Sequence, residues 1–148
     1  MPRFRNFMPA GVIPATLIAF NSDYSIDEKS TRKHLSHVCD VSGITGVTIN
    51  GHASEVHACS DLEQQQILNF SLDEVGDNIP IVNGVWADGS YEAARIAKWS
   101  EAAGASCILV FPPQPIMMMQ GQLKPDMALA HFKTIADATD LPIIAFQY

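Results

Sequence analysis

The stretch Gly46–Glu55, with the sequence Gly-Val-Thr-Ile-Asn-Gly-His-Ala-Ser-Glu, joins an apolar run to a polar turn. The β-branched residues Val47–Ile49 suit a short strand that is buried on both faces. The run ends at Asn50 and Gly51, which let the backbone turn sharply and leave its N–H groups unshielded. A turn of this kind at the end of a buried strand can hold a carboxylate.

Apolar segments and amphipathic segments alternate on both sides of this stretch, at intervals of roughly 30 residues, the period of βαβ units. Strands are expected at Gly11–Phe20, from Gly46, at Ile79–Trp86, at Ser106–Phe111 and from Leu141. Helices are expected from Ser25 or Asp27 to about Val41, from Ser60 to about Val75, from Ser90 to Gly104 and from Pro125. The pattern predicts an α/β fold with a parallel sheet covered by helices.

A parallel sheet covered by helices occurs in two arrangements, an open doubly wound sheet and a closed (β/α)8 barrel, and the pattern fits both. No GxGxxG or GxxxxGK[ST] motif follows the first expected strand, which removes the main support for a nucleotide-binding open sheet.

Length and charge narrow the class of protein. A chain of 148 residues that is 47% hydrophobic has apolar material for one core, so residues 1–148 are expected to belong to a single domain. The net charge of -7 argues against nucleic acid or an anionic membrane as a partner. The expected partners are small molecules and other protein chains.

The cysteines and the N-terminus point to a cytoplasmic protein. Cys39, Cys59 and Cys107 form neither a CxxC motif nor an evident disulfide framework. No apolar run precedes Pro9, so no secretory signal is expected, and no run of about 18 apolar residues occurs.

No metal site is expected either. The pairs His34/His37 and His52/His57 lack the spacing of zinc motifs.

Segments along nearly the whole chain carry a family resemblance. They are Gly11–Ala15 with Phe20 and Asn21, Ser25–Asp27, Gly51–Glu55, Ala103–Ala105, Val110–Pro113, His131–Lys133 and Thr139–Ile144. In their composition and order these segments resemble the N-terminal half of the dihydrodipicolinate synthase and N-acetylneuraminate lyase family.

The resemblance implies a (β/α)8 TIM barrel, present here as its first half with about four βα units and strand five. A complete barrel takes ~250 residues. The family members are aldolases or lyases that bind pyruvate or a related 2-oxo acid as a Schiff base with a lysine on strand six. They need no cofactor, and they are commonly homotetramers.

The strand-six lysine is expected beyond residue 148. Lys98, Lys124 and Lys133 lie on or beside expected helices and do not fit the role. The isolated chain is therefore expected to be inactive.

The turn after strand two departs from the family pattern Gly-Thr-Thr-Gly-Glu, because His52 and Ala53 occupy the threonine positions. The backbone of Gly51, His52, Ala53 and Ser54 could still hold the substrate carboxylate, but the family's hydroxyl relay is lost. His52 is either a replacement acid/base group or a polar loop residue. Ser54 is either a ligand hydroxyl or a turn residue.

Strand five departs as well, because Phe146 stands where the family has its catalytic tyrosine. Tyr148 faces the same side of the strand and is either the replacement proton carrier or a packing residue of the barrel interior.

The segment after strand four has Pro112-Pro113-Gln114-Pro115 where the family commonly has Pro-Tyr-Tyr-Asn. The missing tyrosines argue against dihydrodipicolinate synthesis and favour a dehydratase, an aldolase or another lyase.

Trp86 and Asp88 follow strand three and are expected at the same rim, where they could contact the second part of a substrate. Packing is the alternative role for Trp86. A family member without catalysis, serving as a ligand-binding or assembly module, is the alternative function.

Overall fold

The computed structural model describes residues 1–113 and 124–147. Helices and strands alternate along them, as the sequence predicts. The elements are α1 (Glu28–Cys39), β1 (Val47–Ile49), the 3-10 turn η1 (Val56–Ala58), α2 (Asp61–Val75), β2 (Ile81–Val85), α3 (Ser90–Ala103), β3 (Cys107–Val110), α5 (Pro125–Ala136) and β4 (Ile143–Ala145).

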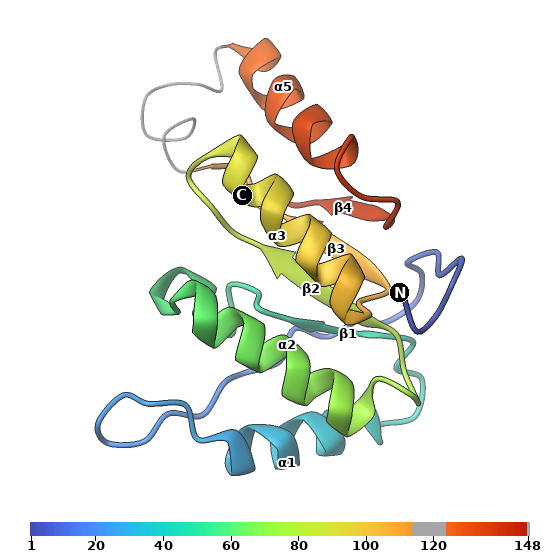
Figure 1. The fold of residues 1–148 in the computed structure, drawn as a ribbon. Coiled ribbons are helices and arrows are strands. Elements are labelled where there is room, and N and C mark those ends of the chain that lie inside the picture. The colour runs from blue at the N-terminus through green and yellow to red at the C-terminus, as the bar shows by residue number, and fades with distance from the viewer. Residues whose placement is uncertain (114–123, 148) are drawn as a thin grey trace.

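The strands form one parallel sheet in the order β1-β2-β3-β4, which is their order in the sequence. In Figure 1 the helices follow the sheet in the same sequence, from α1 at the bottom to α5 at the top. Helix α1 packs on α2, α2 on α3, and α3 on α5. A doubly wound sheet reverses its strand order and divides its helices between two faces. Consecutive strands with neighbouring helices are instead the arrangement of a barrel wall.

The segment Gly11–Phe20 differs from its prediction as a buried strand. It forms isolated bridges in place of a ladder: parallel ones from Val12 to Ile44 and from Ala15 to Thr48, and an antiparallel one from Phe20 to Ile26. Val12 and Leu17 are 58% and 56% exposed. Pro14 has no N–H to donate to a ladder, and within the described residues the parallel bridges of the segment all run to the stretch 44–48 at the start of the sheet.

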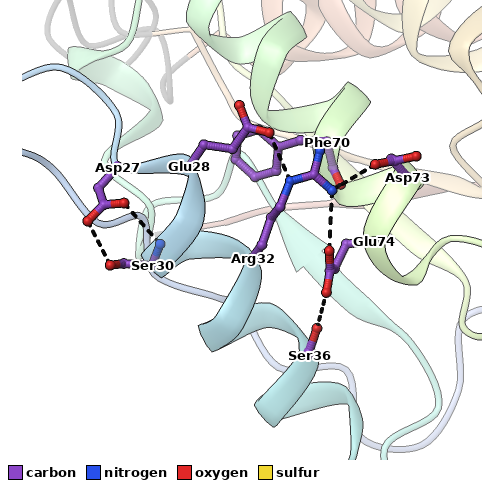
Figure 2. A network of polar contacts seen from close by, with 8 residues as sticks. All are labelled: Asp27, Glu28, Ser30, Arg32, Ser36, Phe70, Asp73 and Glu74. Atoms are coloured by element: carbon purple, nitrogen blue, oxygen red, sulfur yellow. Dashed lines mark hydrogen bonds and ion pairs between the residues drawn. The ribbon is translucent and has the colours of Figure 1, made fainter.

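The starts of the first two helices follow their sequence signals. The Asp27 carboxylate accepts hydrogen bonds from the backbone N–H and the hydroxyl of Ser30, at 3.0 and 2.6 Å, and caps α1 (Figure 2). Ser60 and Glu63 form the predicted capping box of α2, since each side chain accepts a hydrogen bond from the other's backbone N–H. The helix ends at Val75, as expected.

The start of α3 differs from its prediction. Gly89 is the N-cap residue and Ser90 is the first helical residue, with no side-chain cap. The Ser90 hydroxyl instead contacts His131 on α5, which a local capping rule does not foresee.

The core lies between the sheet and the helices. Its aliphatic side chains come from every layer, so that strand and helix bury each other's apolar faces. Fully buried members include Val47, Ile67, Leu68, Val85, Ile96, Ile108 and Ile135.

Arg32 joins α1 to α2 (Figure 2). Its Nε donates to Glu28 at 2.8 Å, and its Nη1 donates to the carboxylates of Asp73 and Glu74, at 2.8 and 3.3 Å, and to the Phe70 carbonyl at 3.2 Å. The guanidinium carbon also lies 5.5 Å from the centre of the Phe70 ring. One side chain thus links three carboxylates, a carbonyl and a ring across the two helices.

We expect Arg32→Met to lower the free energy of unfolding of the full-length protein by about 1–2 kcal/mol. The Arg32 side chain is only 25% exposed, and its removal leaves the carboxylates of Glu28, Asp73 and Glu74 without their shared cation. The matched control is Lys133→Met, which removes an ion pair with Asp137 whose side chains are 75% and 64% exposed, and should cost less than about 0.5 kcal/mol. Urea denaturation measures both, and equal losses would contradict a special role for Arg32.

Candidate active site at the carboxyl ends of the strands

The ends of the four strands bring together residues that are far apart in sequence. Asn50 follows β1, Trp86 follows β2, Phe111 follows β3 and Phe146 follows β4. In a parallel barrel this end of the sheet carries the ligand site.

The turn after β1 is fixed by buried amides. Asn50 has a φ of 49° and is fully buried. Its Nδ2 donates to the Gln64 carbonyl at 2.9 Å and to Asn83 Oδ1 at 2.8 Å. The Asn83 Nδ2 donates in turn to Ser100 Oγ on α3, at 2.9 Å. Asparagine tolerates this left-handed conformation better than most residues do, and the amide chain holds the turn against β2, α2 and α3.

Two hydrogen bonds between the Ser54 side chain and the Gly51 backbone close the turn. The Ser54 hydroxyl accepts from the Gly51 N–H at 2.7 Å and donates to the Gly51 carbonyl at 3.1 Å. Ser54 is 1% exposed. The N–H groups of Glu55 and Val56 donate back to the carbonyls of His52 and Gly51, at 3.0 and 3.3 Å. Ser54 therefore shapes the turn from inside, and Ala53 lies at its tip.

His52 is at the centre of a ring cluster, by which we mean His52, His57, Trp86, Phe111 and Phe146. The centre of its imidazole lies 4.9 Å from that of Phe111 and 5.6 Å from those of Trp86 and Phe146. The His57 ring is 5.9 Å away. Sequence analysis singled out His52, Phe146 and Trp86 separately, and the structure brings the three together.

The surroundings of His52 favour its neutral form. Burial lowers the pKa of this imidazole below its ordinary value, and the neighbouring charge of His57 lowers the pKa further. A neutral imidazole accepts protons, so the group is suited to act as a base near neutral pH.

The expected residues of strand five are only partly described. Phe146 stacks on His52, with 14° between the two ring planes, and its N–H donates to the Val110 carbonyl at 2.9 Å. The Phe146 ring thus points into the cluster. Tyr148 lies outside the described residues. Asp88 lies in the loop after β2 and is exposed.

His131 is a buried polar residue that the sequence analysis did not select as a site residue. It is 1% exposed, and its Nδ1 and Nε2 lie 3.0 Å from Ser90 Oγ and 3.3 Å from the Phe111 carbonyl. A carbonyl only accepts, so Nε2 carries the hydrogen and Nδ1 accepts from Ser90. Burial lowers the pKa of His131, although its bond to Phe111 opposes that shift. The sequence signal for its burial was its position four residues before Ile135, which places both residues on the same buried face of α5.

All three cysteines are free, as the sequence predicts. Burial raises the pKa of the Cys107 thiol to about 12 and that of Cys39 to about 11. Burial also raises the pKa of Cys59. Thiols with such pKa values are poor nucleophiles at neutral pH, which argues against cysteine chemistry.

No three His, Cys, Asp or Glu side chains in ranges 1–113 and 124–147 come together as metal ligands. None of the helices in the same ranges has the length and apolar character to cross a membrane.

Comparison with known proteins gives a consistent result. Residues 8–148 match the dihydrodipicolinate synthetase family. The chain is 30% identical over 139 residues to the 4-hydroxy-tetrahydrodipicolinate synthase of Methanococcoides burtonii, covering 93% of this chain and 44% of that protein. It therefore spans less than half the length of this curated relative.

Solved structures show the fold. A putative dihydrodipicolinate synthetase from Pseudomonas aeruginosa superposes with a TM-score of 0.84 at 20% identity, over 95% of this chain and 47% of that chain. A dihydrodipicolinate synthase from Acinetobacter baumannii, solved in complex with pyruvate, gives 0.79 at 24% identity, over 93% and 45%. The expected fold, the first half of a (β/α)8 barrel, is confirmed.

Proposed function

Because this chain belongs to the dihydrodipicolinate synthetase family, we propose that it forms the first half of the barrel of a lyase that binds pyruvate or a related 2-oxo acid as a Schiff base. The observation that carries the proposal is the turn Gly51–Glu55, which lies at the carboxyl ends of parallel strands beside the His52 ring. Residues 1–148 are then one part of a single barrel domain.

The turn supplies the carboxylate site in this proposal. Ser54 and Gly51 hold each other in a fixed geometry, so the backbone at the tip of the turn, His52 and Ala53, keeps its orientation without a threonine. Backbone N–H groups that are held in this way can bind an anion without reorganising.

His52 takes the role of the acid/base group that the family's threonine and tyrosine share. Its lowered pKa keeps the imidazole neutral and able to remove a proton from the carbon beside the keto group. Phe146 has no proton to move and packs against the His52 ring. Tyr148 is the second candidate for a proton carrier.

The Schiff-base lysine is proposed to lie beyond residue 148. Lys98 is on α3 and Lys133 is on α5, where Lys133 pairs with Asp137 at 2.9 Å. Lys124 is the N-cap residue of α5. On this proposal the isolated chain is inactive, and the complete protein is a cytoplasmic homo-oligomer.

The departures from the family pattern favour a reaction other than dihydrodipicolinate synthesis. His52 and Ala53 replace two threonines and Phe146 replaces a tyrosine, so the hydroxyl relay of the family has no equivalent at these positions. A dehydratase, an aldolase or another lyase of a 2-oxo acid fits these residues better.

The loss of these hydroxyls is also the specific observation behind a second candidate function, a family member that binds its ligand without catalysis. The two candidates differ in one covalent step, because only the lyase forms an imine with its keto acid.

The test is reduction of the full-length protein with borohydride in the presence of pyruvate, followed by intact-mass measurement. We expect one reduced pyruvate adduct per chain, mapped by peptide analysis to a lysine outside residues 1–148. Omission of borohydride is the control and should leave the mass unchanged. An unchanged mass with both reagents would exclude the pyruvate-type Schiff base and favour the non-catalytic candidate.

A further inference from the structure

The residues of the ring cluster follow the carboxyl ends of the four strands β1–β4. His52 and His57 follow β1, Trp86 follows β2, Phe111 follows β3 and Phe146 follows β4. Besides the contacts of His52, the ring centres of Phe111 lie 5.0 Å from Phe146 and 5.7 Å from Trp86, and those of His57 and Trp86 are 6.0 Å apart. The residues that meet at the mouth of the sheet are thus aromatic side chains from four separate segments.

The cluster differs from a closed core. Phe111 is 1% exposed, but His52, Trp86 and Phe146 are only partly buried and His57 is exposed. Val85 and Val110, the strand residues immediately before Trp86 and Phe111, are fully buried. Partly exposed rings at the carboxyl end of a parallel sheet are placed to contact a ligand.

The backbone behind the rings is held rigidly. His131 donates to the Phe111 carbonyl from α5, and the buried amides of Asn50 and Asn83 fix the turn that carries His52. A surface that keeps its shape before the ligand arrives loses little entropy on binding.

The chemistry of the rings selects one kind of substituent. A carboxylate or hydroxylated chain placed against the ring faces of Trp86, Phe111 and Phe146 would lose hydration without gaining matching hydrogen bonds, because these faces carry no donor or acceptor. A flat aromatic group would stack on these faces or meet them edge to face, and such ring contacts are favourable beyond the area that they bury. Trp86 offers the largest ring and lies nearly perpendicular to the His52 ring, at an interplanar angle of 84°.

We propose that the substrate is a 2-oxo acid whose group beyond the keto carbon is aromatic or a flat conjugated chain, held against Trp86 and the ring cluster. This inference rests on the proposed function, since it places the keto acid at the neighbouring Gly51–Ser54 turn. It assigns to Trp86 the discrimination between substrates.

The test compares the binding of phenylpyruvate, 2-oxoglutarate and pyruvate to the full-length protein by isothermal titration calorimetry. We expect phenylpyruvate to bind at least tenfold more tightly than 2-oxoglutarate. Trp86→Ala should remove most of this preference and leave pyruvate affinity within about twofold, and Trp86→Phe should restore part of it. The control is Tyr91→Ala, because Tyr91 is an aromatic residue that is 84% exposed on α3.

The outcomes separate this inference from the proposed function. Equal affinity for phenylpyruvate and 2-oxoglutarate, or an equal loss of all three ligands in Trp86→Ala, would overturn the aromatic assignment. If either of these two binding results is obtained and the borohydride experiment still gives a pyruvate adduct, the proposed lyase function is retained and only the aromatic assignment is rejected. No adduct together with a retained preference for phenylpyruvate would overturn the lyase and keep the aromatic site.

Discussion

Replacing Gly84 with alanine should lower the free energy of unfolding of the full-length protein by at least about 3 kcal/mol. A Cβ at this position would lie 2.6 Å from the Asn50 carbonyl carbon, closer still to the carbonyl oxygen, and 3.3 Å from the Gly51 nitrogen. All three are backbone atoms, so no side chain can rotate to make room.

The turn cannot withdraw without a further cost. Asn50 is fully buried, and the hydrogen bonds that its side-chain amide donates to Gln64 and Asn83 would break if its backbone carbonyl moved away from β2. Gly84 is therefore required by the close approach of one strand end to the next turn, and its own φ is not in the left-handed region.

Gly51→Ala is the matched control, because Gly51 lies at the same end of the sheet. A Cβ there would make an ordinary contact, 3.6 Å from Thr48 Cγ2, and should change stability by less than about 1 kcal/mol. Soluble yield and urea midpoints measure both variants. A soluble Gly84→Ala protein with the wild-type midpoint would show that the strand end is free to move.

Replacing His52 with glutamine should slow proton exchange at the methyl group of pyruvate in D2O by about 100-fold or more. This exchange needs the Schiff base and a base beside the methyl carbon, but no second substrate. Nuclear magnetic resonance follows it directly in the full-length protein. His52→Thr, which restores the residue type of the family at this position, should retain more activity than His52→Gln.

The pH dependence follows from the lowered pKa of His52. Burial, and then the charge of His57, favour the neutral imidazole, which is the form that accepts a proton. Exchange should therefore be at its maximum above the pKa and should fall as pH drops through it, with a midpoint below the ordinary histidine value of about 6.5. His57→Gln removes the neighbouring charge, so the midpoint should move to higher pH.

His37→Gln is the control for the histidine series, because His37 is exposed on α1. It should change neither the rate nor the midpoint. An acid limb that persists unchanged in His52→Gln would assign the titrating group to another residue.

The alternation of strands and helices was predictable because its signals are local. The capping box of Ser60 and Glu63, the end of α3 at Gly104 and the start of α5 at Pro125 depend on residues within one helical turn of each other. The strand at Gly11–Phe20 was overpredicted for the complementary reason. Its apolar composition suits a buried strand, but Pro14 cannot donate to a ladder and the segment pairs only through isolated bridges.

The geometry of the candidate site was not predictable in the same way. Sequence identified the turn, His52, Trp86 and Phe146 one at a time, and nothing local indicates that the rings of Trp86 and Phe146 both lie within 6 Å of the His52 ring. His131 shows the same limit, because its partners Ser90 and Phe111 are 41 and 20 residues away.

The amino-acid sequence by itself therefore determined the βα alternation, the parallel sheet, most helix ends and the family. The tertiary structure decided the strand order, the pairing of Gly11–Phe20 through isolated bridges, the contact of Gly84 with Asn50 and the assembly of the ring cluster. The physical reason is the separation in sequence over which each kind of interaction acts. Periodicity and capping act between residues a few positions apart, whereas the site forms only when sheet pairing brings the ends of four strands to one place.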